Sequence, residues 1–191
     1  MDAIEALLTR RSVGRLTEPA PDDEQLRTML TAATAVPDHG LLRPWRFIVL
    51  RGEGLRALAE AFADAQAVRE PEAASASAGL VAATRAKLAR APVVIAVVAS
   101  PRPSEKVPRW EQDASAAAAA QNLCLAAHAM GFGAMWRTGW YGDAPEVRVH
   151  LAIGDHEHLM GWVYVGSIPP DAAAPAARPV VDLDDVVEWR T

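Results

Sequence analysis

Residues 93–99 read VVIAVVA and form the most apolar stretch of the chain. A strand with one face in water alternates apolar and polar residues, whereas an unbroken apolar run is typical of a strand covered on both faces. Pro92 stands directly before this run, where a strand can begin. We therefore expect residues 93–99 to be the central strand of a layered sheet.

A long alanine-rich segment follows this strand. Residues 111–130 read EQDASAAAAAQNLCLAAHAM, and Gly131 comes directly after them. Alanine has the highest helix propensity, and glycine commonly ends a helix. A helix whose side chains are this small and this apolar is expected to be packed on every side.

Similar patterns predict the remaining elements. Further strands are expected at residues 46–51, 134–137 and 159–165, and further helices at 2–10, 22–37, 52–68, 80–90 and 145–153. Residues 69–79 are small and polar and predict a mobile loop. Strands that alternate with helices indicate an α/β or α+β protein built around a layered sheet.

Length and composition limit the class of protein. The chain has 191 residues, of which 51% are hydrophobic, and a mean hydropathy of +0.04, so we expect one globular domain spanning residues 1–191. The net charge is −5, and the 19 Lys and Arg residues form no basic run, which argues against a nucleic-acid partner. From Ser167 onward the sequence is rich in Pro and Ala and then ends in an apolar VVEW. This tail, residues 167–191, is expected to dock, with a partner subunit as one candidate surface.

Targeting and redox signals indicate a cytoplasmic protein. The N-terminal residues MDAIE are acidic and lack the apolar core of a signal peptide. The longest apolar run, residues 91–99, is far shorter than the ~20 residues that a membrane span needs. Cys124 is the only cysteine in the sequence, so an internal disulfide is excluded.

Two weak motifs are better explained as ordinary structure. Residues 52–57, GEGLRA, fit the dinucleotide-binding pattern, but the next strand starts about forty residues later, and the glutamate would repel a pyrophosphate. Cys124 and His128 on one helix could be half of a metal site, yet the helix is apolar, which favours core residues. His156 and His158 flank Glu157 in a polar turn and are expected to be solvated. We expect no metal site.

Arginines at two places are candidates for binding a phosphate. Arg10, Arg11 and Ser12 end the first helix, where guanidinium groups and a hydroxyl can bind one phosphate or can simply interact with the helix dipole. Arg137 follows a buried strand and a tryptophan, so it needs an anionic partner or solvent. That partner is either a carboxylate of the protein or a phosphate held together with Arg10.

Four motifs taken in order resemble those of the nitroreductase family, and in particular a small subfamily of NAD(P)H nitroreductases. They are RRS at 10–12, PDH at 37–39 with RPWRFIV at 43–49, KVPRWEQ at 106–112, and GFGAMWR at 131–137. Their order and spacing agree with the family from Met1 to about Val165. One departure is Ala35, where the typical relative has an arginine four residues before the histidine, so one phosphate or flavin contact is expected to be missing.

The resemblance implies an α+β fold with α/β/α layers, in which a mixed sheet lies between helices, and a homodimer with an FMN at each of two subunit-interface sites. It implies that Arg10, Arg11 and Ser12 hold the phosphate and ribityl end of FMN. Met135, Trp136 and Arg137 would line the same cofactor, and His39 would reach it from the other subunit. The family's nicotinamide contacts fall on Leu125, Ala126, Ala127, His128, Ala129 and Met130.

The activity implied by the resemblance is an FMN-dependent NAD(P)H oxidoreductase reaction. Hydride would pass from NADH or NADPH to the flavin, and then, in a ping-pong reaction, to a nitroaromatic, quinone or similar small acceptor. Because the flavin carries this chemistry, no catalytic acid, base or nucleophile is expected from the protein. A flavin-binding protein for storage or sensing, without turnover, is the alternative. The sequence does not select the acceptor, or NADH over NADPH.

Overall fold

The computed structural model describes residues 1–76, 78–172 and 179–190 of the chain. The strands are β1 (Trp45–Arg51), β2 (Val93–Ala99), β3 (Gly133–Arg137) and β4 (His158–Gly166). The helices are α1 (Ala3–Thr9), α2 (Asp23–Thr34), α3 (Gly52–Arg69), α4 (Pro71–Ala76), α5 (Ala78–Ala86), α6 (Arg109–Ala129) and α7 (Pro145–His150). Short 3-10 turns lie at His39–Leu41, Leu88–Arg90, Trp140–Gly142 and Leu183–Asp185.

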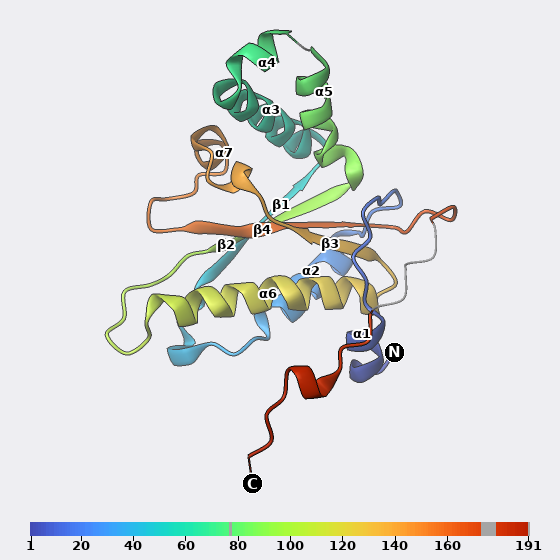
Figure 1. The fold of residues 1–191 in the computed structure, drawn as a ribbon, viewed down its shortest axis with the longest axis vertical. Helices are drawn as coiled ribbons and strands as arrows, with labels where there is room; N and C mark the ends of the chain where they lie inside the picture. Colours follow the sequence, from blue (N-terminus) through green and yellow to red (C-terminus); the bar gives the residue numbers. More distant parts are fainter. Residues whose placement is uncertain (77, 173–178, 191) are drawn as a thin grey trace.

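The strands form one sheet between two layers of helices. Figure 1 shows α2 and α6 on one face of the sheet and α3, α5 and α7 on the other. The strand order is β1-β2-β4-β3, and each pair of neighbouring strands is antiparallel. The predicted α+β class and its α/β/α layers are therefore confirmed. In the described part of the chain, the parallel component of the predicted mixed sheet is an isolated bridge between Ser12 and Ala134.

β2 is the inner strand that its sequence predicts. All seven of its residues are buried. Its side chains alternate between two cores: Val94 and Ala96 pack with the α3 layer, whereas Val93 and Ile95 pack with the α6 layer. The absence of polar alternation in VVIAVVA follows directly from this position, because neither face of the strand meets water.

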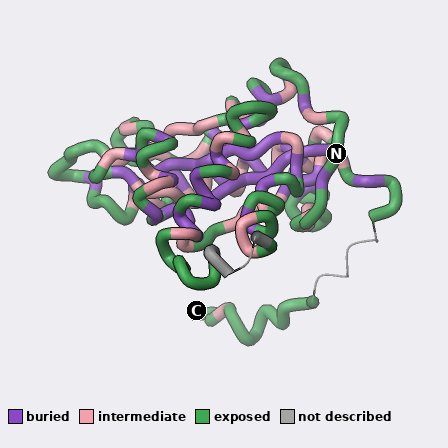
Figure 2. Tube along the Cα trace, turned by 90° about the horizontal axis from the view of Figure 1, so that it is seen from above, coloured by how far each residue is buried: buried purple, intermediate pink, exposed green. Residues whose placement is uncertain are grey.

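α6 is buried along one face and not on every side, so that prediction is wrong for a single chain. The buried positions recur every three or four residues: Gln112, Ser115, Ala116, Ala119, Ala120, Leu123, Cys124 and Ala127. On the other face, Ala118 and Leu125 are half-buried and Ala114 is exposed. The sequence concealed this because the residues on the outer face are small or apolar like those on the inner face. Figure 2 shows the buried residues as a central layer with exposed segments around it.

The predicted mobile loop at residues 69–79 is also wrong. α4 covers Pro71–Ala76, and α5 begins at Ala78. Pro71 occupies the first residue of α4, where proline is tolerated because its missing N–H has no partner inside the helix in any case. The alanines that looked like loop residues are strong helix formers. Residue 77 lies outside the described residues.

The helix that follows residue 22 is confirmed in detail. The side chain of Asp22 accepts a hydrogen bond from the backbone N–H of Gln25, and the Gln25 side chain accepts one from the N–H of Asp22. This reciprocal capping box is the one that the spacing of the two residues predicts. Within the described residues, no helix combines the length and the apolar character that crossing a membrane would require.

Candidate functional site

The segment after α1 lies along the free edge of β3. Ser12 pairs with Ala134 in a parallel bridge, and the N–H of Val13 donates to the carbonyl of Ala134 over 3.0 Å. The structure therefore brings together two of the sequence-predicted groups, residues 10–12 and residues 135–137. They come from opposite ends of the chain and meet because β3 has no neighbouring strand on this side in the described sheet.

Arg137 faces this N-terminal segment. A Cβ atom added at Gly14 would lie 3.8 Å from Nη2 of Arg137, so the glycine leaves open space beside the guanidinium. The guanidinium lies over the ring of Tyr164, 5.6 Å from its centroid. Among the residues that the structure describes, Arg137 forms no ion pair with a carboxylate. The alternative of an internal carboxylate partner is therefore not supported.

Arg11 plays a different part from its neighbours. Its Nη1 donates to the carbonyls of Leu8 and Arg10 over 2.8 and 2.9 Å. These bonds satisfy carbonyls at the end of α1, which is the helix-end role that arginines often have. Arg11 therefore holds the turn that carries Arg10 and Ser12, and these two residues stay predicted contacts of an external anion.

Met135 and Trp136 point to opposite faces of the edge strand. Trp136 packs against the α6 core, and its Nε1 donates to the carbonyl of Met160 over 3.0 Å. Gly161 makes this possible: a Cβ there would lie 2.5 Å from the carbonyl oxygen of Arg137 and still closer to Trp136 Nε1. Gly161 also has φ +138°, a conformation that side chains disfavour. Sequence reasoning overlooked this glycine, which holds two of the predicted site residues in place.

The predicted nicotinamide residues occupy the last turn of α6, beside α1, as Figure 1 shows. The hydroxyl of Thr9 donates to the carbonyl of Glu5 over 2.6 Å, so the 2.8 Å contact between Thr9 and His128 is a bond donated by His128 Nε2. Burial, Arg10 and Arg11 lower the pKa of His128. His128 is half-buried and hydrogen-bonded, so the expectation that it is a core residue is wrong.

The other residues of this stretch differ in exposure. Ala127 is 0% exposed and belongs to the core, whereas Leu125, Ala126 and Met130 are half-buried and Ala129 is exposed. Cys124 is buried as expected, and burial raises the pKa of its thiol to about 11. In the described part of the chain, no group of three His, Cys, Asp or Glu side chains is arranged to hold a metal ion.

His39 lies at the opposite end of α6. Its Nδ1 donates to Glu111 Oε2 over 2.7 Å, and its side chain is 59% exposed. Glu111 and His128 are 17 residues apart on one helix, which at 1.5 Å per residue is about 25 Å. Within one chain the structure therefore does not bring His39 to Arg10 and Ser12. Ala35, where the typical relative has arginine, is exposed at the end of α2.

Glu157, which lies between the two histidines expected to be solvated, is itself buried. It is 6% exposed, and both of its carboxylate oxygens accept from Arg46, over 2.8 and 2.7 Å. Hydrogen bonds from Arg46 hold its pKa at about 2 in spite of burial. His158 is half-buried and its Nδ1 accepts from Arg109 over 3.0 Å, whereas His156 is exposed as predicted. Arg46 and Glu157 are 111 residues apart in sequence, so no local pattern indicates that they pair.

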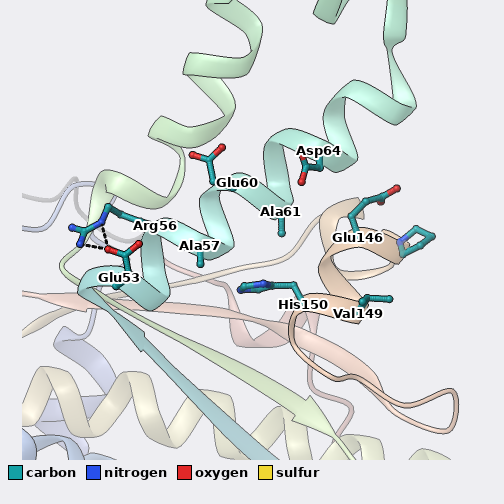
Figure 3. A pocket seen from close by; sticks show the side chains of 10 residues that line it. Glu53, Arg56, Ala57, Glu60, Ala61, Asp64, Glu146, Val149 and His150 are labelled. Atoms are coloured by element: carbon teal, nitrogen blue, oxygen red, sulfur yellow. Dashed lines mark hydrogen bonds and ion pairs between the residues drawn. The ribbon is translucent and has the colours of Figure 1, made fainter.

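A larger groove, which is acidic, lies elsewhere. It has a volume of about 930 Å³ and runs between α3 and α7. Figure 3 shows Glu53, Glu60, Asp64 and Glu146 around it. This groove contains the start of the GEGLRA motif, and β1 and β2 on either side of α3 are antiparallel. Because the dinucleotide-binding unit needs parallel strands, the structure agrees with the rejection of that motif.

The layered α+β fold and the arginine-bearing edge of β3 define a protein with a candidate anion site next to an exposed helix face. The model of the nitroreductase family matches residues 7–167, which is most of the chain. The chain belongs to the nitroreductase family.

Curated relatives agree with this assignment. The chain is 42% identical over 169 residues to the Escherichia coli (strain K12) protein named "Putative NAD(P)H nitroreductase YdjA", covering 87% of this chain and 88% of the relative. It is 39% identical over 190 residues to a Haemophilus influenzae protein named "Putative NAD(P)H nitroreductase", covering 99% and 100%.

Solved structures share the fold. A nitroreductase-like family protein from Bacillus cereus superposes with a TM-score of 0.81 at 22% identity, covering 99% of this chain and 96% of that one. The FMN and NADPH-dependent nitroreductase NfnB from sphigopyxis sp. strain HMH superposes with a TM-score of 0.74 at 23% identity, covering all of both chains. At these identities the likeness concerns the fold.

Proposed function

We propose that this protein is an FMN-dependent NAD(P)H oxidoreductase of the nitroreductase type. The observation that carries the proposal is that the segment after α1, which carries Arg10 and Ser12, runs along the edge of β3: Ser12 pairs with Ala134, and Gly14 lies beside Arg137. The names of its relatives as NAD(P)H nitroreductases support the same activity. NfnB, which shares the fold, is described as FMN and NADPH-dependent.

The donors at this edge fit the phosphate of FMN. Two guanidiniums and a hydroxyl are the groups that bind a phosphate with charge-assisted hydrogen bonds. Gly14 leaves space beside Arg137, as a bound group would require. Arg10, Ser12 and Arg137 would hold the phosphate and ribityl end, while Met135 and Trp136 would border the ring system. Arg11 would contribute mainly by shaping the turn.

FMN, when bound, accepts and donates the hydride. The chain itself then has to anchor the cofactor, orient it and leave one face of it open to a nicotinamide and to an acceptor. We assign no catalytic acid, base or nucleophile. The half-buried and exposed residues at the end of α6, with Leu125 and His128 among them, would border the nicotinamide of NADH or NADPH. The buried side chain of Ala127 would not contact the nicotinamide and would affect the site only by packing in the core.

The working unit in this proposal is a homodimer. His39 lies about 25 Å from the Arg10 end of α6, so it can join the site only if a second chain supplies it. The outer face of α6 is incompletely covered, and small or apolar residues such as Ala114, Ala118 and Leu125 lie on it. The start of the tail packs on its own chain, since Ser167 pairs with Thr17 and Pro169 is buried. Residues 179–190 are exposed apart from Val187, which suits a segment that packs on a partner.

The identity of the cofactor is tested by denaturing the purified protein and measuring the released flavin by mass spectrometry. We expect FMN. Recovery of FAD alone, or no uptake of FMN on reconstitution, would refute the assignment. Anaerobic addition of NADH and NADPH should then bleach the flavin; a flavin that neither donor reduces would indicate a storage or sensing protein instead.

The kinetic order is a further expectation. If donor and acceptor use the same open face in turn, double-reciprocal plots with a quinone or a nitroaromatic acceptor should be parallel. Intersecting lines would indicate a ternary complex and would exclude the ping-pong scheme. An acceptor panel measured in the same way identifies the preferred substrate class.

A further inference from the structure

A small pocket of about 320 Å³ lies beyond the end of β3, on the α3 side of the sheet. Three cationic side chains line it: Lys87, Arg90 and Arg137. They come from three places in the chain, namely the end of the α5 region, the 3-10 turn before β2, and the last residue of β3. The fold therefore brings together three cationic residues that are not clustered in the sequence.

The pocket is unusual in its charge. None of the described residues that line it is Asp or Glu, although the whole chain carries a net charge of −5. Among the residues that the structure describes, Lys87, Arg90 and Arg137 take part in no ion pair. Like charges held together repel one another, and a bound anion offsets this repulsion.

Two of the three cations are held in place. Nζ of Lys87 donates to the hydroxyl of Tyr141 over 2.6 Å, and that hydroxyl donates to Gln66 Oε1 over 2.7 Å. Lys87 keeps two further N–H donors, because an ammonium group has three. The guanidinium of Arg137 lies over the ring of Tyr164. Cations fixed in this way lose little freedom when a ligand binds.

The aromatic side chains of the pocket stack on one another. The ring of Tyr141 stacks on Phe62 at 4.2 Å and on Trp140 at 4.0 Å. A ligand is therefore expected to bind by charge and hydrogen bonds and not by stacking on Tyr141. Burial raises the pKa of Tyr164 to about 12 while Arg137 and Arg90 oppose the rise, so its hydroxyl stays neutral and can donate a hydrogen bond.

We propose that this pocket binds the carboxylate or phosphate group of a small organic anion, with Lys87 and Arg90 as its principal partners and Arg137 as a third. Its volume lies at the lower end of the range for ligand pockets, which suits an aromatic carboxylate or a small phosphate ester and excludes a dinucleotide. Arg137 also faces Gly14, so the pocket adjoins the edge of β3. The pocket shares Arg137 with the candidate flavin-phosphate site, whereas Lys87 and Arg90, on which the test below depends, take no part in that site.

Calorimetric titration of the full-length protein, as purified and at low ionic strength, tests the proposal with benzoate and inorganic phosphate as probes. Arg90→Gln is expected to weaken binding by about tenfold or more, because it removes a charge-assisted hydrogen bond. Lys87→Gln should weaken it severalfold, and Arg90→Lys should keep most of the affinity. Arg69→Gln is the matched control: this arginine lies over Trp140, 4.3 Å from the ring centroid, but does not line the pocket.

The Arg10→Ala variant separates this pocket from the candidate flavin-phosphate site. Binding that is lost in Arg90→Gln but kept in Arg10→Ala supports the pocket. Three results would overturn it: equal affinity in wild type and Arg90→Gln, a loss that follows Arg10→Ala instead, or no binding of either probe at about 10 mM, a concentration that would detect even millimolar affinity. The outcome does not depend on turnover, so it can be negative while the oxidoreductase proposal stands.

Discussion

The two ends of α6 carry charge in different ways. At the N-terminal end, Glu111 accepts from His39, and Asp113 lies 3.7 Å from both Arg109 and His158. Nearby, Arg46 and Glu157 form a bidentate pair. At the C-terminal end, Arg10 and Arg11 lie close enough to lower the pKa of His128, while Glu5 opposes them.

This difference separates charges that stabilise the fold from charges that can accept an external group. A cation paired with a carboxylate inside the protein has little left to offer a ligand. A surplus of one sign, placed beside a helix and an open strand edge, favours an anion from outside. Pocket size does not identify the candidate anion sites, because the acidic groove between α3 and α7 is larger than the cationic pocket beyond β3.

The largest effect is expected from Glu157→Gln at the paired end. The substitution removes a charge that Arg46 and the Gly154 N–H both contact, and we expect it to lower the free energy of unfolding by about 2–3 kcal/mol. The matched control is Glu53→Gln, which breaks the exposed pair with Arg56 and should cost less than about 1 kcal/mol. Urea unfolding of the two variants measures the difference. Equal losses would show that burial of the pair is unimportant.

The same carboxylate gives stability a defined dependence on pH. The pKa of Glu157 is about 2 in the folded protein, below its ordinary value of 4.5, so the folded state binds fewer protons between these values. Its contribution is therefore complete above about pH 4.5 and is lost as the pH falls towards 2. Between pH 6 and pH 2, the free energy of unfolding should therefore fall less steeply for Glu157→Gln than for the wild type. Parallel curves would contradict the assignment.

The next largest effect is expected at the C-terminal end of α6, near Arg10 and Ser12. Arg10→Ala should weaken FMN binding by roughly tenfold to a hundredfold, because a hydrogen bond to a charged group contributes about 1.5–3 kcal/mol. Ser12→Ala removes a neutral donor and should cost less. FMN titration followed by fluorescence measures both, and thermal melts of the apo forms check that the fold is intact. An unchanged affinity in Arg10→Ala would remove Arg10 from the phosphate site.

His39→Ala is expected to have a smaller effect on FMN binding. His39 lies at the opposite end of α6 within one chain, but in a dimer it would belong to the same site as Arg10 of the other chain. Mixing His39→Ala with Arg10→Ala subunits should restore tight FMN binding. Random exchange makes half of the dimers mixed, and each mixed dimer holds one intact site, so about a quarter of all sites should recover. If differently tagged subunits exchange and no tight sites appear, His39 and Arg10 do not meet across an interface.

The smallest effect is a change in the titration of His128. Arg10 helps to lower its pKa, so Arg10→Ala should raise that pKa, and bound phosphate should raise it too. In the folded protein His128 therefore contributes stability that is present above pH 6.5 and is lost as the pH falls below it. An NMR titration of the histidine ring measures each shift. A pKa that is the same with and without Arg10 would show that the surplus charge does not reach His128.

Elements with a strong local pattern could be predicted from the sequence. The unbroken apolar run predicts β2, and the spacing of Asp22 and Gln25 predicts the start of α2. The helix α4 was missed because alanine, serine and proline occur both in loops and in short helices, whereas α5 was predicted with a later start. The partly exposed face of α6 was missed because alanine has the same appearance on a buried and an exposed face.

Long-range pairs set the limit for the candidate site. His39 and Glu111 are 72 residues apart and Arg46 and Glu157 are 111 apart, so neither pair leaves a local signal. The residues themselves left the closeness of Arg10 to Arg137 as one of two alternatives, and the family resemblance favoured it. The tight contact at Gly161 depends on a tryptophan of the adjacent strand, and sequence alone does not reveal such packing.

Cys124 allows the rate at which α6 detaches from the sheet to be measured. It is the only cysteine in the sequence, and in the folded protein it is 2% exposed, with a thiol pKa of about 11. A thiolate reagent therefore has one target, and it reacts only when α6 moves away from the sheet. The labelling rate at increasing reagent concentration reports how often this helix detaches, without any engineered probe. Labelling of Cys124 therefore measures the rate of local unfolding in the unmodified protein.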